Sequence, residues 1–128
     1  MTACPVAFGM PAFLANRGSV GYGAATQVHV KRYEVLPDDT LANGKMFIHL
    51  SKETERGITD GLRVDRKGNL YETGPGEAWV ISPDGKHLGT IRAPEQATNL
   101  GFGDANRKTL YIAARTSIYK IRVSPPGL

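Results

Sequence analysis

The sequence predicts an all-β fold of repeated four-stranded antiparallel units, a partial β-propeller. Hydrophobic and polar residues alternate over short runs such as 28–33 and 118–123, which is the period of a half-buried strand, and no window shows a helical stripe. The 15 Gly and 8 Pro among 128 residues are typical of many strands joined by tight turns. The chain also repeats itself at an offset of about 40 residues, the length of one propeller blade.

The expected strands follow one another with short connections. Nine runs have strand character: 27–35, 45–50, 60–65, 69–73, 77–82, 87–92, 98–103, 109–113 and 117–123. Gly68 stands where a tight reversal needs a positive φ angle, and SPDG at 82–85 is a strong hairpin signal. Connections this short predict sequential antiparallel pairing.

The repeats assign these strands to blades. The segment 60–64 aligns with 98–102, 69–72 aligns with 109–112, and 78–81 aligns with 118–121. Residues 60–92 therefore supply four strands of one blade, 98–123 supply three strands of the next, and 27–50 supply two more, about two and a half blades in all. A free-standing β-sandwich or meander of nine strands fits the same spacing and stays open.

Composition excludes several classes of protein. Cys4 is the sole cysteine, so no internal disulfide can form. The net charge of +4 is spread along the chain as separate basic pairs without interleaved aromatics, which argues against a nucleic-acid partner. The longest apolar run falls short of the roughly 18 residues of a membrane helix, and the N-terminus has no basic region of a secretory signal. We therefore expect a cytoplasmic protein with no membrane partner.

Five motifs in collinear order resemble the gluconolactonase/regucalcin (senescence marker protein-like) family. They are ITDGLRVDRKGNLY at 58–71, GPG at 74–76, WVISPDGK at 79–86, TNLGFG at 98–103 and KTLYIAAR at 108–115. The first is similar to the family signature PDG-L-x-VD-x-x-GNLY, with Thr59 where the family usually has Pro. The resemblance covers roughly residues 27–123 and corresponds to the C-terminal portion of the family.

The resemblance implies a six-bladed propeller with a divalent cation at the top of its central channel. Ca²⁺ is the first candidate for this cation. It implies hydrolysis of sugar lactones, a metal-dependent carboxylic-ester reaction. Asp60 falls on the Asp of the family signature, so it is the implied metal ligand and catalytic residue. Carboxylate oxygens suit hard cations. From residue chemistry alone, however, the favoured interpretation of Asp60-Gly61 is a turn dipeptide.

Three further polar residues have competing interpretations. Asn99 enters the corresponding strand of the next repeat and is expected in the same substrate pocket, or it satisfies local backbone groups. Arg115 lies in a connection on the same rim, where it would steer an anionic ligand or be a solvated loop residue. Glu72 replaces the apolar residue usual in the family and is a packing liability in a strand. The three histidines lack metal-ligand spacing.

Six blades need about 240–270 residues, so the motif-bearing part is expected to be a truncated propeller segment at 26–128. Residues 1–25 match no family motif. We interpret them as a replaced N-terminus or as a poorly ordered N-terminal segment. We expect a lactone hydrolase homologue that is weakly active or inactive alone. The alternatives are a non-catalytic blade module that binds a protein partner through exposed strand edges, and a product without function. Open edges also predict self-association.

Overall fold

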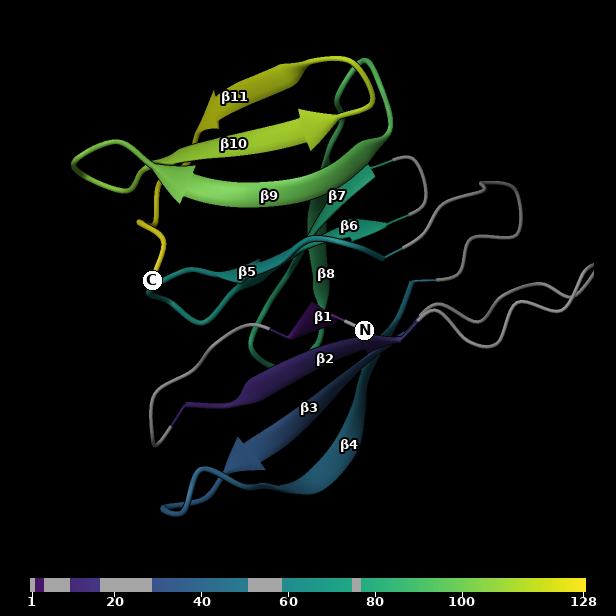
Figure 1. Ribbon diagram of the computed structural model, residues 1–128, viewed down its shortest axis with the longest axis vertical. Helices are drawn as coiled ribbons and strands as arrows, with labels where there is room; N and C mark the ends of the chain where they lie inside the picture. The colour runs from purple at the N-terminus through teal and green to yellow at the C-terminus, as the bar shows by residue number, and fades with distance from the viewer. Residues whose placement is uncertain (1, 4–9, 17–28, 51–58, 75–76) are drawn as a thin grey trace, which may run out of the picture.

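Three antiparallel sheets follow one another along the chain (Figure 1). The computed structural model describes residues 2–3, 10–16, 29–50, 59–74 and 77–128. Each of the nine predicted strands is present there, and no helix occurs in these residues. The all-β fold class is confirmed, and the sheets are the blade-like units that the repeat predicted. The second sheet lies between the other two in Figure 1.

The first sheet has two strands that the sequence analysis did not predict. Its order is β1 (Thr2–Ala3), β2 (Ala12–Asn16), β3 (His29–Val35) and β4 (Leu41–His49). Strand β2 pairs with β3 from Ala12↔Tyr33 to Asn16↔His29 and buries Phe13. This short run carries little pattern of its own, so its pairing with β3 decides that it is a strand. The 1–25 segment therefore contributes to a sheet.

The second sheet is the complete four-stranded unit expected for 60–92. It contains β5 (Leu62–Val64), β6 (Leu70–Gly74), β7 (Glu77–Ile81) and β8 (His87–Ile91) in that order. Its β5–β6 and β7–β8 turns place Gly68 at φ 82° and Gly85 at φ 86°, the backbone region that favours glycine. Both turns were read correctly from the sequence.

The third sheet has three strands, as the repeat predicted. They are β9 (Ala97–Gly103), β10 (Thr109–Ala114) and β11 (Ile118–Arg122), with β10 in the centre. The segment after β11 returns to the second sheet, where the Arg66 amide donates to the Pro126 carbonyl at 2.9 Å and the Leu128 amide donates to the Val64 carbonyl at 3.1 Å. These bonds tie the third sheet to β5.

Two hydrophobic cores fill the spaces between the sheets. The core between the first and second sheets contains Phe13, Ala15, Val30, Leu50, Leu62, Val64, Leu70, Trp79 and Ile81. The core between the second and third sheets contains Tyr71, Ala78, Ala97, Leu100, Leu110 and Ile112. Side chains of a strand alternate between its faces, so even-numbered residues of β6 face the first sheet and Tyr71 faces the third.

The internal repeat extends to side-chain hydrogen bonds. In the second sheet, Asp65 accepts a hydrogen bond from the Tyr71 hydroxyl at 3.3 Å. In the third, Asp104 accepts one from the Tyr111 hydroxyl at 2.8 Å. Each pair joins the residue at a turn to a tyrosine of the following strand. The two sheets are therefore versions of one unit, with the first pair buried and Asp104 exposed.

Alkaline pH is expected to destabilise the fold through Tyr71. Burial, followed by the nearby Asp65 carboxylate, raises the pKa of Tyr71 to about 12, against 10.0 for a free tyrosine. The unfolded chain thus loses this proton first, and the free energy of unfolding falls as pH rises from 10 to about 12. Urea unfolding across that range measures the slope. Tyr71→Phe should flatten it, whereas Tyr33→Phe, in the first sheet, should not.

No helix in the described residues is long and apolar enough to cross a membrane. Cytoplasmic residence stays a prediction.

Candidate functional site

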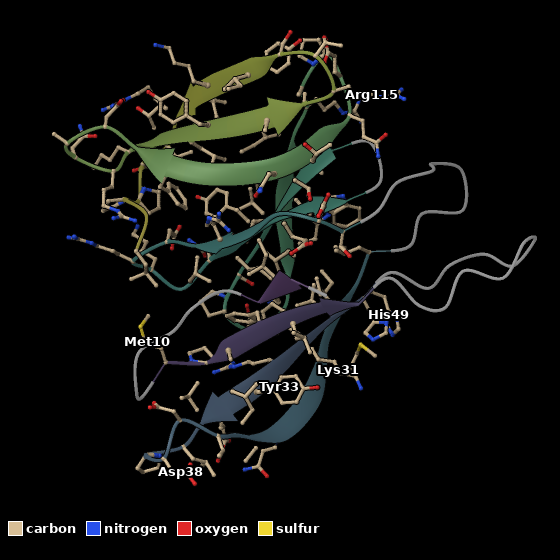
Figure 2. All side chains as sticks on the ribbon, in the orientation of Figure 1. Met10, Lys31, Tyr33, Asp38, His49 and Arg115 are labelled. Carbon is tan, nitrogen blue, oxygen red and sulfur yellow. The ribbon has the colours of Figure 1, made fainter. Side chains whose placement is uncertain are left out.

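One end of the molecule gathers the polar residues singled out in the sequence. Strands β5 and β9 begin at this end, and β6 and β10 finish there, because neighbouring strands run antiparallel. Asp60 lies two residues before β5, Asn99 is near the start of β9, and Arg115 follows β10. Figure 2 labels Arg115 at this end, on the right of the view. The three predicted site residues therefore share a rim.

Backbone hydrogen bonds to Thr73 hold Asp60 in place. The Thr73 hydroxyl accepts from the amide of Asp60 at 3.1 Å and from the amide of Gly61 at 2.8 Å. The Thr73 amide in turn donates to the Gly61 carbonyl at 2.9 Å, which extends the β5–β6 ladder. Thr73 is fully buried and Asp60 is half-buried. The Asp60 side chain thus leaves a rigid backbone at the start of the strand.

Asn99 lies against the residue that follows Asp60. A Cβ atom on Gly61 would stand 2.6 Å from both the Cα and the Oδ1 of Asn99, so β5 and β9 approach closely there. The Asn99 Oδ1 accepts from the Leu100 amide at 2.8 Å, as the interpretation of a locally satisfied Asn expects, while the side chain is exposed at the rim. The structure therefore places Asn99 beside Gly61, one residue away from Asp60.

Arg115 lies beside Glu95, which precedes β9. The Glu95 carboxylate accepts from the Thr116 amide at 2.8 Å and from its hydroxyl at 2.5 Å. These hydrogen bonds first, and the Arg115 charge to a smaller degree, lower the pKa of Glu95. Arg115 is exposed, so it behaves mainly as a solvated rim cation.

Glu72 is the residue whose position the sequence analysis missed. It is 0% exposed, and neither carboxylate oxygen has a hydrogen-bond partner among the described residues. Burial, followed by the charge of Asp60, raises the pKa of Glu72 well above its usual value. The sequence carried one signal, a carboxylate at an apolar strand position, but nothing linked it to Asp60.

The donor set near Asp60 suits a hard cation. Asp60 and Glu72 bring two carboxylates close enough for their charges to interact, and oxygen is the ligand atom that Ca²⁺ and Mg²⁺ prefer. Both Glu72 oxygens are unpartnered in the described part of the chain, so they are available as ligands. The described residues hold no group of three or more His, Cys, Asp or Glu suited to a metal. The fit is therefore to an oxygen-ligated ion that takes further oxygens from water or substrate.

Other polar features lie elsewhere. A hollow of about 250 Å³ on the first sheet is lined by Arg32, Tyr33, Glu34, Asn43 and Lys45. The rings of His29 and His49, which are paired across β3 and β4, lie 5.9 Å apart. Neither feature includes a residue around Asp60.

Comparison with known proteins identifies relatives of this chain. The family model of the SMP-30/gluconolactonase/LRE-like region matches residues 18–116. A gluconolactonase of Zymomonas mobilis is 36% identical over 73 residues, which are 56% of this chain and 20% of that protein. The chain thus spans about a fifth of the length of the curated relative it matches.

Solved structures share the fold. A luciferin-regenerating enzyme superposes with a TM-score of 0.63 at 22% identity, over 81% of this chain and 33% of that one. A gluconolactonase from Xanthomonas campestris superposes with a TM-score of 0.62 at 24% identity, over 93% of this chain and 34% of that one. At this level of identity the likeness concerns the fold.

Proposed function

The chain belongs to the SMP-30/gluconolactonase/LRE-like family, and on that premise we propose that it is a sugar-lactone hydrolase homologue that depends on a divalent cation, with Ca²⁺ first. The observation that carries the proposal is the retained Asp60, held on a rigid backbone at the rim beside Asn99. The reaction adds water across the ring ester, so that the acyl C–O bond breaks and a hydroxy acid forms.

Each rim residue has a role in this proposal. Asp60 holds the cation, and its carboxylate takes a proton from the attacking water. The cation, when bound, supplies Lewis acidity that polarises the lactone carbonyl. The exposed Asn99 amide contacts a sugar hydroxyl, and Arg115 attracts the anionic product.

We expect the isolated 128-residue chain to turn over weakly or not at all. The described residues bring two carboxylates together, whereas Ca²⁺ takes 6–8 oxygen ligands. An ion held mainly by water binds weakly and is poorly positioned.

The test measures both hydrolysis and binding of a gluconolactone, with Ca²⁺ and with EDTA. We expect any turnover above the buffer rate, and saturable lactone binding, to require Ca²⁺ and to disappear in Asp60→Asn. Asp39→Asn removes an exposed carboxylate from a turn of the first sheet and should change neither. If neither turnover nor lactone binding depends on the cation, the proposed function is wrong. Fast turnover that EDTA and Asp60→Asn abolish would instead refute only the expectation that the isolated chain has weak activity.

A second function, a non-catalytic module that binds a protein partner through exposed strand edges, is favoured by the edge strands. Strands β4, β8 and β11 each lie at the edge of a sheet. Large hydrophobic side chains are exposed on all three: Leu41 and Met46, Leu88, and Ile118 and Ile121. Size exclusion with light scattering separates the two functions. A monomer favours the binding module, and a closed oligomer that takes up Ca²⁺ favours a reassembled enzyme.

A further inference from the structure

Glu72 is a buried carboxyl group with no protein partner in the described residues. It stands in the middle of the second sheet, opposite Leu62 on β5 and opposite Trp79 on β7. Its side chain is 0% exposed, and both carboxylate oxygens lack hydrogen bonds there. A lone carboxylate in such surroundings is costly unless something compensates its charge.

Hydrogen bonds and strand pairing bring the backbone of Asp60 close to Glu72. Leu62 and Glu72 are direct cross-strand partners, and the bond between Thr73 and Gly61 extends this ladder by one step. Asp60 lies two residues before Leu62, and the amides of Asp60 and Gly61 both donate to the hydroxyl of Thr73, the residue after Glu72. The backbone of Asp60 is therefore held against β6 next to Glu72, and the charge of Asp60 acts on the Glu72 carboxyl group.

An ion from solvent can reach Asp60, whereas it cannot reach Glu72 directly. Asp60 is half-buried at the rim, whereas Glu72 is fully buried and pairs with Leu62 and Trp79, which belong to the core between the first and second sheets. The two like charges repel each other until a cation stands between them. Carboxylate oxygens bind Ca²⁺ at about 2.3–2.6 Å, so one ion can contact both groups.

We propose that Glu72 is a second protein ligand of the cation site and that it binds one oxygen-preferring divalent cation together with Asp60. This inference rests on the cation-binding part of the proposed function and not on lactone hydrolysis. The carboxylate comes from a position where the family usually has an apolar residue, so it is a property of this chain.

Trp79 provides a local reporter for the test. It is the sole tryptophan and pairs directly with Glu72 across β6 and β7. Tb³⁺, a luminescent substitute for Ca²⁺, emits strongly when an excited tryptophan lies close to it. Excitation at wavelengths that tryptophan but not tyrosine absorbs therefore detects an ion beside Glu72. Calorimetric titration with Ca²⁺ gives the affinity independently.

We expect sensitised Tb³⁺ emission that Ca²⁺ displaces, and cation binding about tenfold weaker or more in Glu72→Gln and in Asp60→Asn. Glu72→Met fills the same space without a charge and gives a second variant if Glu72→Gln folds poorly. Glu95→Gln, on the same rim, is the matched control and should bind like the parent. Circular dichroism checks that each variant is folded.

The outcomes separate the two proposals. If Asp60→Asn loses the ion and Glu72→Gln and Glu72→Met keep it, Glu72 is not a ligand, and the cation role of Asp60 stands. If the parent shows no sensitised emission and no Ca²⁺ binding, both the inference and the cation dependence of the proposed function are wrong. If binding persists in every variant, the ion lies elsewhere and the inference is overturned.

Discussion

Asp65→Ala is expected to lower the free energy of unfolding by about 3–5 kcal/mol. The Asp65 side chain is 0% exposed and accepts from the amides of Lys67 and Asn69, the Asn69 side chain and the Tyr71 hydroxyl. Alanine leaves these donors without their acceptor, and each one that water cannot reach costs about 1–3 kcal/mol. Urea unfolding followed by circular dichroism measures the loss.

Asp84→Ala is the matched control in the β7–β8 turn of the same sheet. Asp84 accepts from the Ser82 hydroxyl and lies near Lys86, but its side chain is exposed. Water replaces these contacts when the carboxylate is removed, so the loss should be much smaller than for Asp65. Equal losses in the two variants would show that the buried hydrogen bonds of Asp65 contribute little.

Gly61→Ala is expected to destabilise the fold by about 1–3 kcal/mol and to weaken cation binding. The new Cβ atom would stand 2.6 Å from the Cα of Asn99 and 2.8 Å from the Leu100 nitrogen. Both neighbours are backbone atoms, which cannot rotate away, so β5 and β9 must separate. Asp60 would move with β5. Thermal unfolding and the Tb³⁺ titration measure the two effects.

Gly101→Ala tests the same substitution on β9 without the clash. A Cβ atom on Gly101 meets nothing within 4 Å. Replacing a strand glycine by alanine in open space should leave stability unchanged or raise it by up to about 1 kcal/mol. A loss as large as that of Gly61→Ala would mean that the contact with Asn99 does not explain the first result.

Local pattern was sufficient for most of the strands. Alternation of period two and the turn residues around Gly68 and Gly85 placed all nine predicted strands, because both signals depend on neighbours in the chain. The pattern was insufficient for β1 and β2. Strand β2 is defined by its pairing with β3, which lies beyond residues 17–28, and a contact over that separation leaves no period in the sequence.

The candidate site also combines residues that a local motif predicts with contacts that depend on the tertiary structure. Asp60, Asn99 and Arg115 were found by motif, and the repeat predicted that they share one rim. Their roles in cation and substrate binding stay predictions. The contact of Asn99 with Gly61 could not be predicted, because it depends on how closely β5 approaches β9 across two different sheets.

The sequence by itself determined the fold class, the order of the strands and the retained Asp60, since these depend on alternation, turn chemistry and a motif within one strand. Tertiary structure decided the surroundings of that residue. Packing of the first sheet on the second buries Glu72 beside Asp60, and packing of the third brings Asn99 against Gly61. Desolvation and close contact here arise between elements distant in the chain. The sequence therefore shows Asp60 as an isolated carboxylate, and only the folded sheets bring Glu72 near it.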